Sequence, residues 1–126
     1  MKANPAVWFE IYVQDMSRAQ KFYETVLAGK LEKLGDPNDA GIQMMAFPMD
    51  MGKSGASGAL VKVGGFPSGG NSTLVYFACT DCADEGSRVE SAGGRLQRQK
   101  MAIGEYGFIV LAFDTEGNMF GLHSMK

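Results

Sequence analysis

The sequence contains an internal repeat, in which both halves of the chain follow the order strand, aspartate, helix, glycine and strand. Residues 7–34 align with residues 73–99, and Asp15 falls on Asp81, which lies 66 positions later. A repeat of this length is one supersecondary unit present twice. The chain is therefore expected to fold as two similar modules.

A second pair of matching segments extends the repeat. Residues 41–47 (GIQMMAF) align with residues 107–113 (GFIVLAF) at the same offset, so both glycines and both Ala-Phe pairs coincide. The pattern predicts two βαβββ modules of fold class α+β, over about 5–63 and 73–126. The Gly- and Ser-rich stretch 64–72 between them indicates a flexible connector.

Length and composition favour one globular domain. The chain has 126 residues, of which 45% are hydrophobic and 21% are charged. The net charge of −2 and the absence of a basic run argue against a nucleic-acid partner. No apolar run approaches the roughly 18 residues that span a bilayer, and the N-terminal stretch lacks the apolar core of a signal peptide. We expect no membrane partner and a cytoplasmic location.

Alternation along the predicted strands separates a helix-facing side from a side that faces away from the helices. The residues expected to face the helices are Phe9, Ile11, Val13, Val75, Phe77, Cys79, Phe120 and Leu122. Those expected on the opposite side are Trp8, Glu10, Tyr12, Leu74, Tyr76, Ala78, Met119, Gly121 and His123. Because a charged residue stands between two aromatic ones in the first strand, the second side is expected to line a cavity.

The only two cysteines form the stretch CTDC, at Cys79 and Cys82. This spacing occurs in redox motifs that lie between a strand and a helix. A second pair for zinc is missing, and nothing else in the sequence indicates a thioredoxin-like core. A structural role, in which one cysteine ends a strand and the other begins a helix, is the favoured interpretation.

Four features together resemble the vicinal oxygen chelate superfamily of glyoxalases, bleomycin-resistance proteins and extradiol dioxygenases. They are the paired modules, the helix entry DMSRAQKFYETVLAGKL, the segment VESAGGRL and the closing DTEGNMFGL. The resemblance covers nearly the whole chain and is strongest to the branch related to lactoylglutathione lyase, whose members commonly have no assigned reaction. It implies a cup-shaped, eight-stranded mixed sheet that often assembles as a homodimer.

In enzymes of this superfamily, His, Glu or Gln side chains hold a divalent metal that acts as a Lewis acid toward a chelating substrate. The positions that correspond to these ligands are Trp8, Leu74, Gly121 and a residue near Gly58. None of these side chains binds a metal. A rebuilt site around Glu10 and His123 would lack the third protein ligand that catalytic zinc or iron sites usually have. We therefore predict no metal ligands and no cofactor.

Two kinds of site residue are predicted on the cavity side. Glu10 and His123 are candidates for a hydrogen-bonded catalytic pair that relays a proton or binds a polar group. In the alternative, His123 ends its strand as a structural residue and Glu10 lies at a wet rim. The candidates for contact with a small-molecule ligand are Trp8, Tyr12, Tyr76, Tyr106 and Met119. Ordinary packing is the alternative for them.

Two loops are expected near the mouth of the cavity. The glycine-rich stretch 52–58 lacks the strand-loop-helix context of a phosphate-binding motif, so a mobile loop over the cup is predicted. The loop 100–108 is expected to close the other side, with Tyr106 reaching inward. Nine methionines suit either an adaptable cavity wall or core filling.

Three functions are compatible with these residues. The first is binding of a small organic molecule without the metal. The second is an enzyme, a lyase, isomerase or dioxygenase acting on a small carbonyl or aromatic compound, with or without a rebuilt metal site. The third is a non-catalytic, oligomerising module. The missing metal ligands favour the first function over a metal enzyme, and the cavity-facing Glu10 argues against a pure scaffold.

Overall fold

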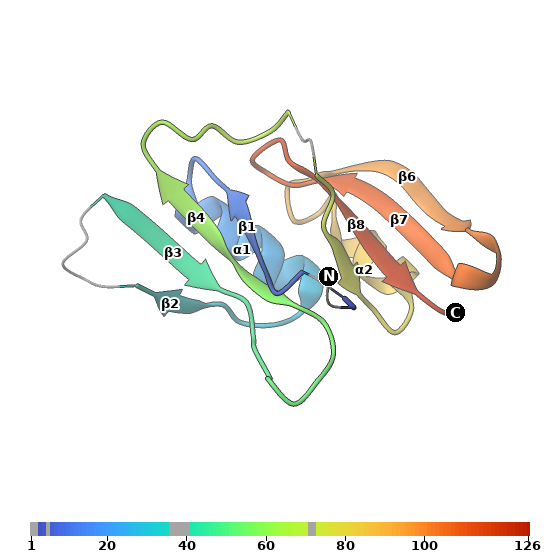
Figure 1. The fold of residues 1–126 in the computed structure, drawn as a ribbon. Coiled ribbons are helices and arrows are strands. Elements are labelled where there is room, and N and C mark those ends of the chain that lie inside the picture. The colour runs from blue at the N-terminus through green and yellow to red at the C-terminus, as the bar shows by residue number, and fades with distance from the viewer. Residues whose placement is uncertain (1–2, 5, 36–40, 71–72) are drawn as a thin grey trace.

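The chain folds into two consecutive sets of four strands, each set with one α-helix (Figure 1). The computed structural model describes residues 3–4, 6–35, 41–70 and 73–126. The first set consists of β1 (Trp8–Tyr12), α1 (Met16–Leu27), β2 (Glu32–Leu34), β3 (Ile42–Ala46) and β4 (Ser57–Val63). The second consists of β5 (Tyr76–Ala78), α2 (Cys82–Arg88), β6 (Arg95–Ala102), the 3-10 turn η1 (Gly104–Tyr106), β7 (Phe108–Phe113) and β8 (Met119–Ser124).

The two sets have the same topology. One sheet has the strand order β1-β4-β3-β2 and the other has the order β5-β8-β7-β6. In each sheet the first strand pairs in parallel with the last, and the remaining pairs are antiparallel. The expected βαβββ duplication is confirmed, with the eight strands of the described residues divided between two four-stranded mixed sheets rather than joined in one.

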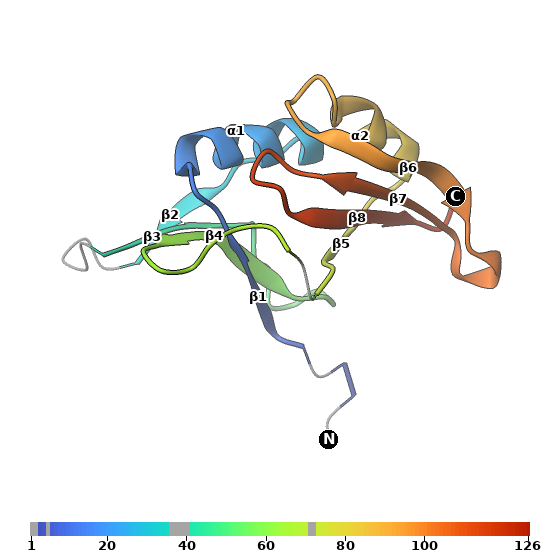
Figure 2. The same cartoon turned by 90° about the horizontal axis from the view of Figure 1, so that it is seen from above.

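Both helices lie on the same side of the two sheets (Figure 2). An aromatic cluster packs under α1 and joins the modules, with ring centroids 5.0 to 6.0 Å apart. Its members are Phe9, Phe22, Tyr23, Phe47, Phe77 and Phe120. The predicted helix-facing residues Ile11, Val13 and Leu122 are buried in the same core. The predicted alternation is therefore confirmed at these positions.

The two aspartates of the repeat cap the two helices. The Asp15 side chain accepts a hydrogen bond from the amide of Arg18 at the start of α1, and Asp81 accepts one from the amide of Ala83 at the start of α2. A helix leaves its first amides without partners, and an aspartate at this position satisfies one of them. The repeated aspartate thus fixes where each helix begins.

The turn between β7 and β8 joins the second module to the first. Buried Glu116 accepts hydrogen bonds from the amides of Gln14 and Asp15, both at 2.9 Å, and from Arg18 Nε at 2.7 Å. Since Gln14, Asp15 and Arg18 surround the start of α1, one carboxylate of module 2 fixes the entry to the helix of module 1. The two modules therefore pair within the chain.

Two further side chains of this turn complete the junction. Asp114 accepts hydrogen bonds from the Tyr23 hydroxyl at 2.7 Å and from the amide of Asn118 at 2.8 Å. Asn118 donates to the carbonyl of Tyr12 in β1 at 3.0 Å. Because Asp114 and Asn118 are both buried, these bonds are shielded from competing water. They hold the start of β8 beside β1.

Candidate functional site

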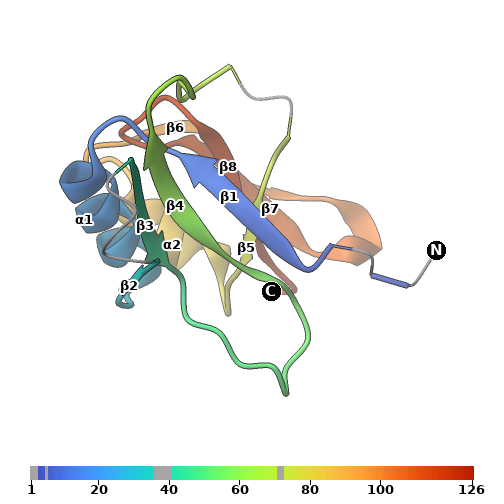
Figure 3. The same ribbon diagram turned by 60° about the vertical axis from the view of Figure 1, so that its left-hand side comes forward.

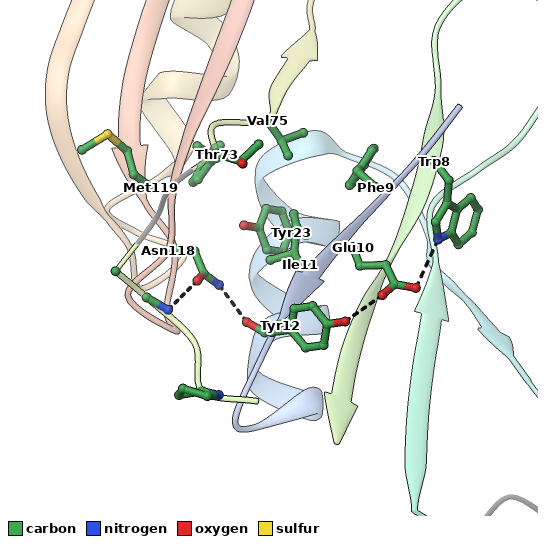
Figure 4. A pocket seen from close by; sticks show the side chains of 14 residues that line it. Trp8, Phe9, Glu10, Ile11, Tyr12, Tyr23, Thr73, Val75, Asn118 and Met119 are labelled. Atoms are coloured by element: carbon green, nitrogen blue, oxygen red, sulfur yellow. Dashed lines mark hydrogen bonds between the residues drawn. The ribbon is translucent and has the colours of Figure 1, made fainter. Parts of the chain in front are cut away.

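A cavity of about 440 Å³ lies where the two modules meet (Figure 4). It is lined by residues of β1, α1, the connector and the start of β8. These are Trp8, Phe9, Glu10, Ile11, Tyr12, Tyr23, Pro67, Gly69, Gly70, Thr73, Val75, Asn118, Met119 and Phe120. In Figure 4, Glu10 and Tyr12 lie on one side of Tyr23, and Asn118 and Met119 lie on the other. The site thus depends on the pairing of the modules.

Glu10 is held at the cavity by its two neighbours on the same face of β1. Trp8 Nε1 donates a hydrogen bond to Glu10 Oε2 at 3.3 Å, and the Tyr12 hydroxyl donates to Glu10 Oε1 at 2.8 Å. Alternate residues of a strand share a face, which brings these three side chains together. The carboxylate is oriented by two neutral donors.

The hydroxyl of Tyr12 is stabilised in its protonated form. The pKa of Tyr12 is raised above 10.0, first by its hydrogen bond to Glu10, then by burial and by the negative charge of Glu10. The phenol therefore remains a donor at neutral pH. Its ring stacks on Phe66, with centroids 5.3 Å apart and planes at 19°.

The inner wall of the cavity is built from buried core residues. Ile11, Tyr23 and Phe120 are all at least nine-tenths buried. Burial raises the pKa of Tyr23 well above its usual value, and the charge of Asp114 and the hydrogen bond to it add to this effect. The Tyr23 hydroxyl thus remains protonated and donates to Asp114, a hydrogen bond that fixes the ring at the inner wall.

The connector between the modules forms the rim of the cavity. The amide of Gly69 donates to Asn118 Oδ1 at 2.7 Å, and Gln14 Nε2 donates to the carbonyl of Phe66 at 3.2 Å. In the described part of the predicted connector 64–72, Phe66 and Gly69 have these hydrogen bonds, and Phe66 also stacks on Tyr12, whereas the flexibility of the connector remains a prediction. Residues 71–72 lie outside the described residues.

Four of the seven predicted site residues meet at this cavity, namely Trp8, Glu10, Tyr12 and Met119. Tyr76, Tyr106 and His123 do not line it. Phe9, Ile11, Val75 and Phe120 line the cavity although they were expected to face the helices instead. The contributions of the connector and of Asn118 were not predicted from the sequence. The only available signal for them was the polar EGN turn, since Asn118 binds both β1 and the connector.

Glu10 and His123 do not form the expected hydrogen-bonded pair. His123 Nε2 lies 2.7 Å from the carbonyl oxygen of Tyr106, whereas the Glu10 oxygens bind Trp8 and Tyr12. The physical reason is position along β8, because Met119 at the start of the strand lines the cavity, whereas His123 lies near its other end, opposite Ala78 and Ile109. The alternative of a structural histidine near the end of its strand fits this geometry.

Tyr106 also differs from its predicted placement. It belongs to the turn η1, its side chain is 68% exposed, and it does not reach into the cavity. Similarly, the stretch 52–58 does not cover the cavity, because the loop between β3 and β4 projects beyond the opposite end of the sheet from the 64–70 segment (Figure 3). Met49 and Met51 in that loop are exposed.

Tyr76 covers Gly121, one of the positions that the resemblance relates to metal ligands. Their strands pair in parallel, with Tyr76 opposite Gly121, and a Cβ atom at Gly121 would collide with the Tyr76 ring. In the first module the same register places Ala59 opposite Glu10, so Ala59 rather than Gly58 corresponds to Gly121. A Cβ atom at Gly58 would instead meet the backbone and ring of Phe9.

The four corresponding positions do not fit a metal. They carry an indole, an isobutyl group, a hydrogen atom and a methyl group, at Trp8, Leu74, Gly121 and Ala59. None of these groups is a ligand for a divalent cation. Elsewhere in the described residues, no group of three or more His, Cys, Asp or Glu side chains is placed to hold a metal ion.

The two cysteines are free thiols, and Cys82 is buried. Burial, followed by the hydrogen bond to Glu85, raises the pKa of Cys79 to about 12. A thiol with such a pKa carries little thiolate at neutral pH, and the thiolate is the reactive form. The geometry therefore favours the structural interpretation of the CTDC stretch.

Comparison with known proteins identifies a matching family model and several proteins of similar fold. Residues 6–47 match a family model described as bleomycin resistance protein-like N-terminal. Glyoxalase I from Zea mays has a TM-score of 0.72 at 20% identity, over 96% of this chain and 46% of the maize protein. This chain thus spans about half the length of the maize protein. No curated protein matches the sequence significantly.

Two structures of similar length agree with this result. A glyoxalase/bleomycin resistance protein/dioxygenase superfamily member from Sphaerobacter thermophilus has a TM-score of 0.70 at 18% identity, over 94% of this chain and 95% of that one. A hypothetical protein from S. aureus has a TM-score of 0.67 at 15% identity, over 98% and 99%. The predicted resemblance is confirmed in the fold, and the family model matches residues 6–47 within the first module. Within the described residues, no helix is long and apolar enough to cross a membrane.

Proposed function

We propose that this chain, which has the glyoxalase/bleomycin resistance/dioxygenase fold, binds a small organic molecule between its modules without the metal of the superfamily. The observation that carries the proposal is the cavity of about 440 Å³ at the module junction. Pockets for small ligands are typically about 300–1,000 Å³, mostly apolar, with a few placed polar groups. This cavity falls within that size range, and its lining combines aromatic rings with polar groups such as Glu10 and Asn118.

The lining residues suit an organic ligand with a flat apolar part. Aromatic side chains contribute much of the wall, and they offer large contact area at low conformational cost. They are Trp8, Phe9, Tyr12, Tyr23 and Phe120. Glu10 supplies an oriented polar contact, and Met119 adds a flexible thioether at the start of β8.

The alternative functions have less support from this geometry. A metal-dependent lyase, isomerase or dioxygenase has no ligand set at the four corresponding positions. Acid/base catalysis by Glu10 and His123 requires two groups that share a reacting centre, and these two have separate partners. A module that served only for oligomerisation would not require the carboxylate of Glu10 between two aromatic side chains. The cytoplasmic location and the homodimer remain predictions.

A fragment screen followed by NMR chemical-shift mapping tests the proposal. We expect hits to shift the amide resonances of Ile11, Tyr12 and Met119. Val75→Trp should fill part of the cavity and weaken binding of the best hit by about tenfold or more, a change worth about 1.4 kcal/mol. Leu74→Trp is the matched control, because Leu74 is the adjacent residue and does not line the cavity.

Two results would contradict the proposal. One is a screen without hits that shift the cavity resonances. The other is a hit whose affinity is the same in Val75→Trp and in the wild type, since the ligand would then bind elsewhere. Thermal unfolding of both variants establishes that they are folded.

A further inference from the structure

Glu10 carries the only charged side chain among the described residues that line the cavity. Its two hydrogen-bond donors, Trp8 and Tyr12, are neutral. The ion pairs of the described residues join Arg18 to Glu116 and Lys100 to Asp81, so neither includes Glu10. Within the part of the chain that the structure describes, the cavity thus contains a negative charge that forms no ion pair.

The carboxylate of Glu10 also has unused acceptor capacity. An ionised carboxylate has about four lone-pair positions, and the indole and the phenol take one on each oxygen. About two positions remain for donors of a ligand. The same two donors fix the carboxylate in place, so its orientation costs little entropy when a ligand binds.

From this arrangement we infer the class of ligand: an organic cation, with a protonated amine bound to Glu10 and an aromatic or apolar group against the rings of the cavity. The inference rests on the proposed function and deepens it. Trp8 and Tyr12 flank the carboxylate, and aromatic faces attract cations in addition to their apolar contact.

Other ligand charges fit the same geometry less well. An anionic ligand would be repelled by Glu10 at short range. A neutral apolar ligand would displace water from the carboxylate and give no charge in return, which costs free energy. A protonated amine provides both the charge and the N–H donors that the free acceptor positions require.

The test uses three probes that share an indole ring and differ in charge: tryptamine, tryptophol and indole-3-acetate. Isothermal titration calorimetry measures their affinities for the full chain. Exposed ion pairs and cation–π contacts are individually weak, so tryptamine should bind about fivefold more tightly than tryptophol. Indole-3-acetate should bind most weakly.

Glu10→Gln should remove the preference for tryptamine and leave the affinity for tryptophol nearly unchanged. Glu32→Gln is the matched control. Glu32 lies in the same cross-strand row, Glu10–Ala59–Ala46–Glu32, at the opposite edge of the sheet, and it does not line the cavity. Glu32→Gln should therefore behave as the wild type does.

Each contrary result has its own meaning. Equal affinities for tryptamine and tryptophol, or a preference that persists in Glu10→Gln, overturn the inference and leave the small-molecule cavity standing. Absence of binding by all three probes also overturns the inference, and the cavity itself is then judged by the fragment screen and by Val75→Trp. Thermal unfolding of Glu10→Gln separates a loss of charge from a loss of fold.

Discussion

At the scale of single residues, two glutamates illustrate how a carboxylate serves structure or binding. Glu116 is buried, and amides, a hydroxyl and a guanidinium occupy its oxygens. Burial raises the pKa of Glu116, but the hydrogen bonds from Arg18, Asp15, Gln14 and Thr115 outweigh it and bring the pKa to about 2. Glu10, in contrast, has two donors and remains open to a ligand.

Glu116→Gln should destabilise the fold by about 2 kcal/mol at pH 7, because the ion pair and part of the capping are lost. This figure lies below the value that the pKa shift alone would give, since the Arg18 side chain is 52% exposed and solvent screens the pair. Urea unfolding measures the loss. Glu90→Gln, at an exposed position, is the control and should change little.

The lowered pKa of Glu116 predicts how the stability of the fold changes with pH. The pKa of Glu116 is about 2 in the folded chain and near its ordinary value of 4.5 in the unfolded chain, so its stabilisation is complete above 4.5. It is lost progressively as the pH falls from about 4.5 toward 2. The wild type should therefore lose more stability than Glu116→Gln in this window. If the unfolding free energies of the wild type and Glu116→Gln changed with pH in parallel, Glu116 would contribute no pH-dependent stabilisation.

Gly121 is required by the Tyr76 ring that covers it. Gly121→Ala should cost about 1–2 kcal/mol, because the added Cβ meets ring atoms close to the Tyr76 backbone, which cannot swing away freely. The cost should nearly vanish in a Tyr76→Ala background. Chemical unfolding of the two single variants and the double variant measures this coupling. An equal cost in both backgrounds would rule out the Tyr76 contact as its cause.

At the scale of elements, local patterns predicted the fold well. Alternation in β1 placed Ile11 and Val13 in the core, and the repeated Asp15 and Asp81 marked both helix starts. These signals depend on neighbours within a few residues, so one sequence contains them. The helix-facing side of the strands and the order of strands and helices along the chain followed from these patterns.

The partners of site residues were harder to predict, because they lie far apart along the chain. Glu10 and His123 share a predicted side, yet His123 lies near the end of β8 away from the cavity, where its ring contacts the carbonyl of Tyr106. The Gly and Ser content of the connector likewise gave no sign of its partner Asn118, which lies 49 positions after Gly69 and accepts a hydrogen bond from its amide. Alternation assigns a face to a side chain and does not identify what lies across from it.

At the scale of the whole molecule, the cavity exists because the modules pair within one chain. The turn that carries Asp114, Glu116 and Asn118 binds the first module at α1 and β1 and also holds the connector. Stability of the junction and integrity of the site are therefore coupled. A variant that loosens the junction should weaken ligand binding without touching the ligand.

The homodimer is a proposal at this same scale. Leu34 and Ile42 are about two-fifths exposed on the face of the first sheet that points away from the helices, where a second copy would cover apolar surface. Sedimentation equilibrium checks the assembly. A mass near twice 13.5 kDa supports the dimer, and a mass near 13.5 kDa at all concentrations contradicts it.

The central claim is that the cavity binds a small organic molecule without a metal. Its most direct test is the affinity of the best fragment hit, measured by calorimetry in chelator and again with added zinc, nickel or manganese. We predict the same affinity within about twofold in all cases, because the corresponding positions provide no metal ligands. Binding that appears only when a metal is present would contradict this account.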